Sequence, residues 1–331
     1  MIASAFIYVV IAGVVTAVVG VVCTLVTYFL YGEPIATQFW QASMIKFNGV
    51  LVGGVGYGLL AFVRNWGRTT LAQLNEVLIT PDEHSASWAA QLQRATSWRW
   101  VIAIAGPLTI VGGIVIWKAG VPFAGFPKYC LLTATISIYV VASSILAFFI
   151  YTIMAFRYIE MADGPSRFRL NCSFASLALQ NIDSFFVISS TLGVLAIYLG
   201  FRGTLTANFV GNSDLFRKMM VLPLVFYLPA TLFYSLYPRY VLRQISESDT
   251  LALIRELEQQ CINETFDGLK ARLEFRKLVL DVKEKIANDR RIVPLLGIRD
   301  APSLTMSIII VIQFVAQKDS VVAGFLNRFF N

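Results

Sequence analysis

The feature that most constrains this chain is a long apolar run without any charged side chain. The run extends from Ile2 to Leu30. About 20 apolar residues are enough for a helix to cross the ~30 Å hydrocarbon core of a membrane. The run lacks the basic start and the short apolar core of a secretory signal peptide. It therefore predicts a retained membrane-spanning helix.

Five further apolar runs follow, and none of them contains Asp, Glu, Lys, Arg or His. Composition agrees with a membrane protein, because 57% of the residues are hydrophobic and 14% are charged, against about 25% charged in soluble domains. We therefore predict an all-α, polytopic membrane bundle of six helices with a cytoplasmic helical extension. The five further runs cover residues 47–63, 100–117, 130–156, 184–201 and 219–237.

A seventh apolar segment, residues 303–317, leaves two alternatives open. It is short for a membrane helix, and one alternative is a short or tilted seventh span. The β-branched stretch Ile308–Ile312 is also typical of a buried strand. The predicted regions are a transmembrane bundle at 1–238 with short amphipathic cytoplasmic loops at 64–99 and 157–183, an amphipathic helical module at 239–300, and a C-terminal hydrophobic segment at 301–331.

Basic residues indicate the orientation of the chain. The net charge is +7, and Arg239 and Arg243 directly follow the sixth apolar run. Basic residues collect on the cytoplasmic flanks of membrane helices, so we expect the N-terminus and residues 239–300 to be cytoplasmic. The same reasoning makes the lipid bilayer, rather than nucleic acid, the expected partner of the basic charge. We also expect a homo-oligomer, with residues 239–300 available to bind a partner protein.

Residue types that carry chemistry are sparse. The single histidine, His84, stands in a polar stretch, and the four cysteines show no metal-ligand spacing. No nucleotide-binding, metalloprotease or hydrolase motif occurs. The apolar runs also lack the ionisable relay that proton-coupled transport requires. We therefore predict no catalytic residue, no metal, no cofactor and no enzymatic activity.

Glycines in the second apolar run predict close helix packing. Gly49 and Gly53 form one GxxxG spacing, and Gly54 and Gly58 form another. Missing side chains let two membrane helices approach closely, either within one chain or between subunits.

Prolines and hydroxyl side chains supply the remaining candidate residues. Pro223 and Pro229 lie inside the sixth run, where each removes a backbone donor and predicts either a static bend or a gating hinge. Hydroxyl side chains in the fourth and fifth runs either hydrogen-bond neighbouring helices or line a pore. The candidates for pore lining are Thr133, Ser137, Ser144, Ser190 and Thr191.

Three functions follow from these patterns. The first is a homo-oligomeric channel that conducts a small ion passively and is gated or assembled through residues 239–300. The second is a non-conducting scaffold or partner-binding subunit of a larger membrane complex. The third is a facilitative carrier for an uncharged or lipid-like solute.

Overall fold

Helices make up nearly all of the described part of this computed structural model, which agrees with the predicted all-α class. One short antiparallel strand pair is the exception, with Leu78 opposite Phe168. The structure describes residues 1–42, 47–79, 88, 90–95, 97–119, 123–161, 167–168, 172–205, 227–245, 248, 252, 255–256, 259, 273–277, 279–281, 284 and 300–315.

Long helices dominate the described part of the chain. The elements are α1 (Ile2–Tyr31), α2 (Glu33–Ala42), α3 (Phe47–Val77), β1 (Leu78–Ile79), α5 (Trp98–Ala119), α6 (Phe126–Glu160), β2 (Arg167–Phe168), α7 (Cys172–Leu205) and α10 (Ala301–Val315). Residues 227–245 are also helical, and we call this element helix 227–245.

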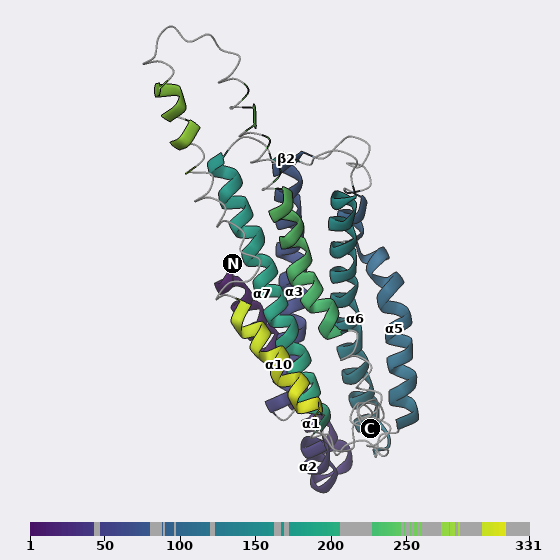
Figure 1. Ribbon diagram of the computed structural model, residues 1–331. Helices are drawn as coiled ribbons and strands as arrows, with labels where there is room; N and C mark the ends of the chain where they lie inside the picture. Colours follow the sequence, from purple (N-terminus) through teal and green to yellow (C-terminus); the bar gives the residue numbers. More distant parts are fainter. Residues whose placement is uncertain are drawn as a thin grey trace, which may run out of the picture.

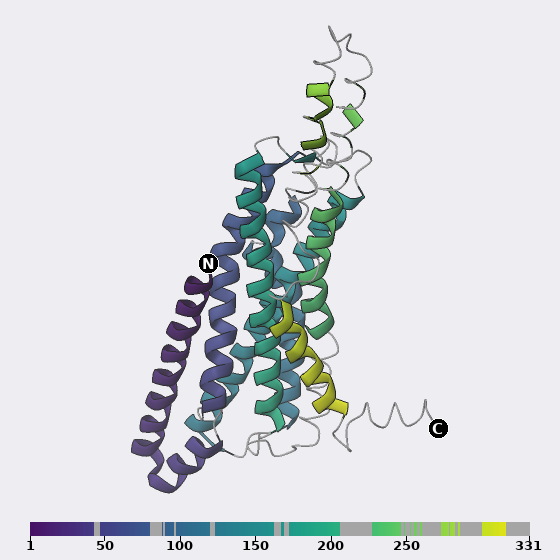
Figure 2. The same cartoon turned by 60° about the vertical axis from the view of Figure 1, so that its left-hand side comes forward.

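The long helices run side by side in an elongated bundle (Figures 1 and 2). The helix α3 packs against α1, α6 and α7, and α5 packs against α6. The helix α1 lies at one edge of the bundle and α5 at another. The helix α10 leans across α7 near the end of the bundle opposite β2 (Figure 1).

Three helices are long and apolar enough to cross a membrane, namely Ile2–Tyr31, Phe126–Glu160 and Leu179–Gly200. These segments indicate a membrane protein. The third contains nearly all of the predicted fifth run, which starts at Ser184. Because α7 is one continuous helix from Cys172, Asp183 lies in the same helix, directly before that run.

The described parts of the predicted cytoplasmic loops at 64–99 and 157–183 are mostly helical extensions of the bundle. The helix α3 continues to Val77, α6 reaches Glu160, and α7 already begins at Cys172. Apolar residues of the first of these segments pack into the bundle core, where Trp88 is 1% exposed. Its ring meets the edge of Phe156 at 5.4 Å between centroids.

Aromatic rings join the central helices. Phe149 of α6 stacks on Tyr234 of helix 227–245, with ring centroids 4.0 Å apart and planes at 17°. Phe186 of α7 meets the same tyrosine ring edge-on at 5.2 Å. Such contacts stabilise a pair beyond the area that it buries. The three helices therefore share one packed core.

The C-terminal apolar segment is a helix over Ala301–Val315, so the alternative of a strand at these residues is wrong. Residues 316 and 317 of the predicted segment, and most of the predicted module 239–300, lie outside the described residues. The described start of that module is not separate from the bundle, because Arg239 stands in the middle of helix 227–245.

Candidate functional site

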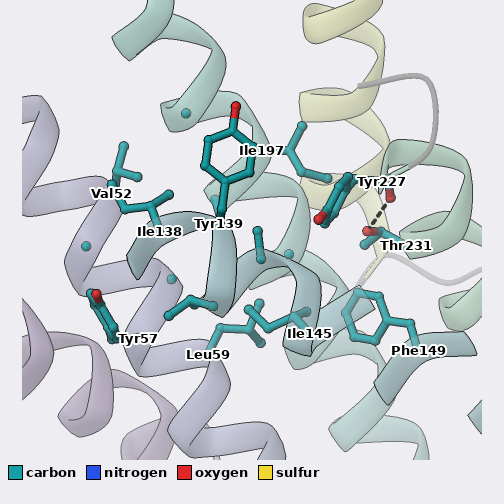
Figure 3. Close-up of a pocket in the computed structure, with 17 residues that line it drawn as sticks. Val52, Tyr57, Leu59, Ile138, Tyr139, Ile145, Phe149, Ile197, Tyr227 and Thr231 are labelled. Atoms are coloured by element: carbon teal, nitrogen blue, oxygen red, sulfur yellow. Dashed lines mark hydrogen bonds between the residues drawn. The ribbon is translucent and has the colours of Figure 1, made fainter. Parts of the chain in front are cut away.

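A cavity lies among α3, α6, α7 and helix 227–245 (Figure 3). Its volume is about 150 Å³, and it is partly open to the surface. Of the 17 described lining residues, 13 are aliphatic, glycine or phenylalanine. The other four carry a polar side-chain atom, and in each case that atom belongs to a hydroxyl group. These four are Tyr57, Tyr139, Tyr227 and Thr231.

Glycines give the cavity part of its volume. Gly56 of α3 and Gly193 and Gly200 of α7 line it. A Cβ at Gly200 would meet nothing within 4 Å, and a Cβ at Gly56 would lie 3.6 Å from Val141. Side chains can therefore be added at these two positions to fill the cavity, whereas a Cβ at Gly193 would lie only 3.0 Å from Thr231.

Hydroxyl groups near the cavity also connect helices. Tyr227 lies within hydrogen-bonding distance of Ser143 of α6, at 3.4 Å between oxygens. Thr231 donates to the carbonyl of Tyr227 at 2.7 Å, as the dashed line in Figure 3 shows. Deeper in the bundle, Ser189 of α7 bonds Tyr234 at 3.0 Å. Two serines from the fourth and fifth apolar runs thus serve interhelical hydrogen bonding.

The glycines proposed for helix packing face α1. A Cβ at Gly58 would lie 2.6 Å from the Cα of Val9, and one at Gly54 would lie 3.0 Å from the Cα of Gly13. A Cβ at Gly53 would come within 2.7 Å of Thr16. The missing side chains on this face of α3 therefore let the backbone of α1 approach closely. Gly49 lies in α3, but its packing is outside the described residues.

The hydroxyl residues proposed for a pore do not gather around the cavity. Ser137, Ser144 and Ser190 donate to carbonyls of their own helices, at 2.7, 2.7 and 3.0 Å. Thr133 is exposed and Thr191 is half-buried. None of the five lines this cavity, and Ser144 lines a second, smaller one of about 30 Å³ beside Arg64 and Trp98. Their role in a pore stays a prediction.

Only one of the two proposed hinge prolines lies within the described residues. Pro229 is exposed near the first described residue of helix 227–245. Pro223 lies outside the described residues. The hinge therefore stays a prediction.

A buried group of three charged residues lies in the same bundle. Arg239 is 1% exposed, and its Nε lies 2.6 Å from Oδ1 of Asp183 in α7. Its Nη1 donates to Oδ1 of Asp300, the residue before α10, at 2.7 Å. Burial makes each charge expensive unless the others compensate it. We call these three residues the ion triad.

Sequence reasoning missed the ion triad. It placed Asp183 at the end of a polar stretch and treated Arg239 as an orientation signal. Arg239 and Asp300 are 61 positions apart, so no local periodicity connects them. The one available signal was that Asp183, Arg239 and Asp300 each stand near the edge of an apolar run.

Three cations contact tryptophan rings around α5. Arg64 lies 3.6 Å from the ring centre of Trp98, and Arg94 lies 4.5 Å from that of Trp100. At the other end, Lys128 lies 5.6 Å from the ring centre of Trp117. Desolvation by partial burial lowers the pKa of Arg64 from its ordinary value. Arginine nevertheless stays charged, because its ordinary pKa is far above neutral pH.

Comparison of the chain with known protein families, curated proteins and solved structures gave no match. Within the described residues, no group of three or more His, Cys, Asp and Glu side chains is arranged to hold a metal ion. The cavity and the ion triad are therefore the candidate functional features of the described chain.

Proposed function

We propose that this protein is a polytopic membrane protein that binds an uncharged, lipid-like molecule in the cavity among α3, α6, α7 and helix 227–245. The character of the cavity walls carries the proposal. Apolar cavities of about 150 Å³ stay dry and accept apolar molecules. Pathways for ions instead use rings of carbonyls or charged side chains. The described walls offer hydroxyl groups alone as polar side-chain groups.

Selectivity for such a ligand has to come from shape and hydrogen bonding. An acyl chain that leaves lipid for an apolar cavity gains little from the hydrophobic effect, because lipid tails are as apolar as leucine. A hydrogen bond is stronger in this low-dielectric setting than in water. Tyr139, Tyr227 and Thr231 would therefore favour a neutral amphiphile with a hydroxyl or carbonyl group.

We also propose six membrane spans with the N-terminus in the cytoplasm. The helix α5 has 22 residues, about 33 Å at 1.5 Å per residue. Aromatic side chains mark membrane interfaces, and cation–tryptophan pairs lie at both ends of α5. The Arg64–Trp98 and Arg94–Trp100 pairs bring more positive charge to one end than Lys128 brings to the other. The more basic end is the cytoplasmic one by the positive-inside rule.

Two hydrogen bonds support this placement of the N-terminus. Tyr8, near the start of α1, accepts a bond from Asn65 at 3.0 Å, beside Arg64. Tyr31, at the end of α1, accepts from the backbone of Phe126 at 3.1 Å, two residues before Lys128. The start of α1 therefore lies at the more basic end.

A matched pair of glycine substitutions tests the binding proposal. Gly200→Leu fills the cavity, whereas Gly113→Leu adds the same side chain at a second glycine that has nothing within 4 Å and does not line the cavity. Purified protein in nanodiscs is labelled with a diazirine-bearing fatty alcohol, and the labelled residues are mapped by mass spectrometry. We expect cavity labelling in wild type and in Gly113→Leu, and a loss of about tenfold in Gly200→Leu. Equal labelling of all three proteins would refute the proposal.

The ion channel and the scaffold stay proposals from the sequence. A conducting path lined by Thr133 would have to form between copies of the chain, because Thr133 is exposed and does not line the cavity within one chain. Ser190 cannot line such a path, because it is buried inside the bundle. Discrete current steps in a planar bilayer, altered by Thr133→Val, would support the channel. Stable capture of one partner that depends on residues 239–300 would support the scaffold.

A further inference from the structure

The helix α10 rests on the bundle by a narrow face. Ser303, Ser307 and Ile310 are buried at a spacing that places them on one side of the helix. On the other side, Ile308 and Ile312 are 58% and 60% exposed. The exposed side is apolar and suits lipid. A helix with this surface has a weak attachment wherever lipid can replace its packed face.

An apolar contact attaches α10 to two helices at once. Ile310 packs with Val194 of α7 and Leu228 of helix 227–245 in one buried cluster. Ile197 packs against the same cluster and also lines the cavity. The helix α10 therefore lies across the seam between α7 and helix 227–245, and this seam forms one wall of the cavity. Figure 3 shows Ile197 and Tyr227 on that wall.

The ion triad joins the same three elements a second time. Asp183 belongs to α7, Arg239 belongs to helix 227–245, and Asp300 precedes α10. All three side chains are at most 4% exposed. The apolar contact and the ion triad thus fasten one seam at two positions.

We propose that α10 is a strap across this seam, and that separation of Asp300 from Arg239 lets the seam open and admits the lipid-like ligand sideways from the membrane. The inference rests on the proposed binding function, and it identifies how access to the cavity is controlled. When α10 leaves the bundle, its packed face contacts lipid instead of α7 and helix 227–245.

Of the two contacts that hold α10 on the bundle, the ion pair between Asp300 and Arg239 controls whether α10 can separate. The apolar face of α10 can move from protein into lipid without a large hydrophobic penalty, because both surroundings are apolar. Separating a carboxylate from its guanidinium costs much more free energy in a low-dielectric setting. When Asp300 does separate, Arg239 keeps Asp183, so one compensated pair remains in the bundle. The opened state therefore avoids an isolated buried arginine.

Two isosteric substitutions separate the strap from general stability. Asp300→Asn and Asp183→Asn each leave one carboxylate with Arg239, but only Asp300→Asn removes the ionic tie of α10. Asparagine caps a helix start about as well as aspartate, so the substitution does not in itself unwind α10. Asp300→Glu keeps the charge and serves as the conservative variant.

Two measurements are made on the full-length protein in nanodiscs. Hydrogen–deuterium exchange reports on residues 301–315, and the initial rate of labelling by the diazirine-bearing fatty alcohol reports on access to the cavity. We expect Asp300→Asn to raise both by about tenfold while final labelling stays at the wild-type level. Asp183→Asn should leave exchange in α10 unchanged, and Asp300→Glu should lie closer to wild type.

The outcomes distinguish the two proposals. Equal exchange in α10 for Asp300→Asn and Asp183→Asn would overturn the strap, whether or not the cavity binds the probe. Faster exchange in Asp300→Asn with an unchanged labelling rate would also overturn it, because α10 would then move without controlling access. An absence of cavity labelling in wild type would instead contradict the binding function.

Discussion

The helices α1 and α6 are both long and apolar enough to cross a membrane, but α1 lies at the edge of the bundle and α6 at its centre. Of the most apolar stretch of each helix, 6% is buried in α1 and 56% in α6. The buried residues of α1 are small, namely Ala5, Gly20 and Thr27. Those of α6 include large rings such as Phe148, Phe149 and Phe156. Apolarity therefore marks both helices for a membrane, whereas packing decides which one forms the core.

The attachment of the two helices differs in kind. The helix α1 meets the bundle mainly along the glycine face of α3, by close backbone approach. The central helices interlock through stacked rings and the ion triad. We therefore expect substitutions in the central helices to affect stability strongly, and most substitutions in α1 to affect it weakly.

The largest effect is expected from Arg239→Met. Loss of the guanidinium leaves Asp183 and Asp300 buried without their shared cation. We expect a loss of at least about 5 kcal/mol, the upper end for breaking one buried pair, because two carboxylates are affected. The control is Arg243→Met, an exposed position on the same helix. Thermal unfolding in detergent measures both, and equal losses would contradict the importance of the ion triad.

A matched pair of phenylalanines tests the comparison directly. Phe149 of α6 is 2% exposed and Phe6 of α1 is 68% exposed. Phe149→Ala should cost about 3–5 kcal/mol, the usual range for a buried ring. Phe6→Ala should cost less than about 0.5 kcal/mol, as for other surface substitutions. Similar losses in chemical denaturation would show that α1 belongs to the core.

A glycine substitution tests how α1 is held. At Gly58 a Cβ would collide with the backbone of Val9, whereas at Gly113 a Cβ would meet nothing within 4 Å. We expect Gly58→Ala to destabilise by about 1–3 kcal/mol, as overpacking usually does. Gly113→Ala should be neutral or slightly stabilising, because alanine favours helices by up to about 1 kcal/mol. If Gly58→Ala were as stable as Gly113→Ala, α1 would not approach α3 this closely.

The smallest effect is expected from Tyr8→Phe. The change removes the hydrogen bond that Asn65 donates to the Tyr8 hydroxyl. The pair is exposed, so the loss should be at most about 1 kcal/mol. The informative measurement is the accessibility of a cysteine introduced at Ala3, where a faster reaction in Tyr8→Phe would show that this bond holds the start of α1. No change would leave the glycine face as the main attachment.

Sequence patterns predicted the helices better than they predicted which helices pack against each other. Residues 64–99 were predicted as a short amphipathic loop, but Leu71 and Leu74 of this segment are buried in the bundle core. The β-branched stretch Ile308–Ile312 was consistent with helix or strand, and only packing on Val194 and Leu228 selected the helix. The cavity could not be predicted, because its walls come from four separate elements and contain no motif.

The sequence by itself determined that the chain is helical and suited to a membrane, because hydropathy and helix length are properties of consecutive residues. It also indicated glycines for close packing at Gly53, Gly54 and Gly58. Only the tertiary structure decided that these glycines meet α1, that α6 is central, and that Asp183, Arg239 and Asp300 share one buried site. Such pairings depend on which residues distant in the chain become neighbours, and packing, not local periodicity, sets that choice.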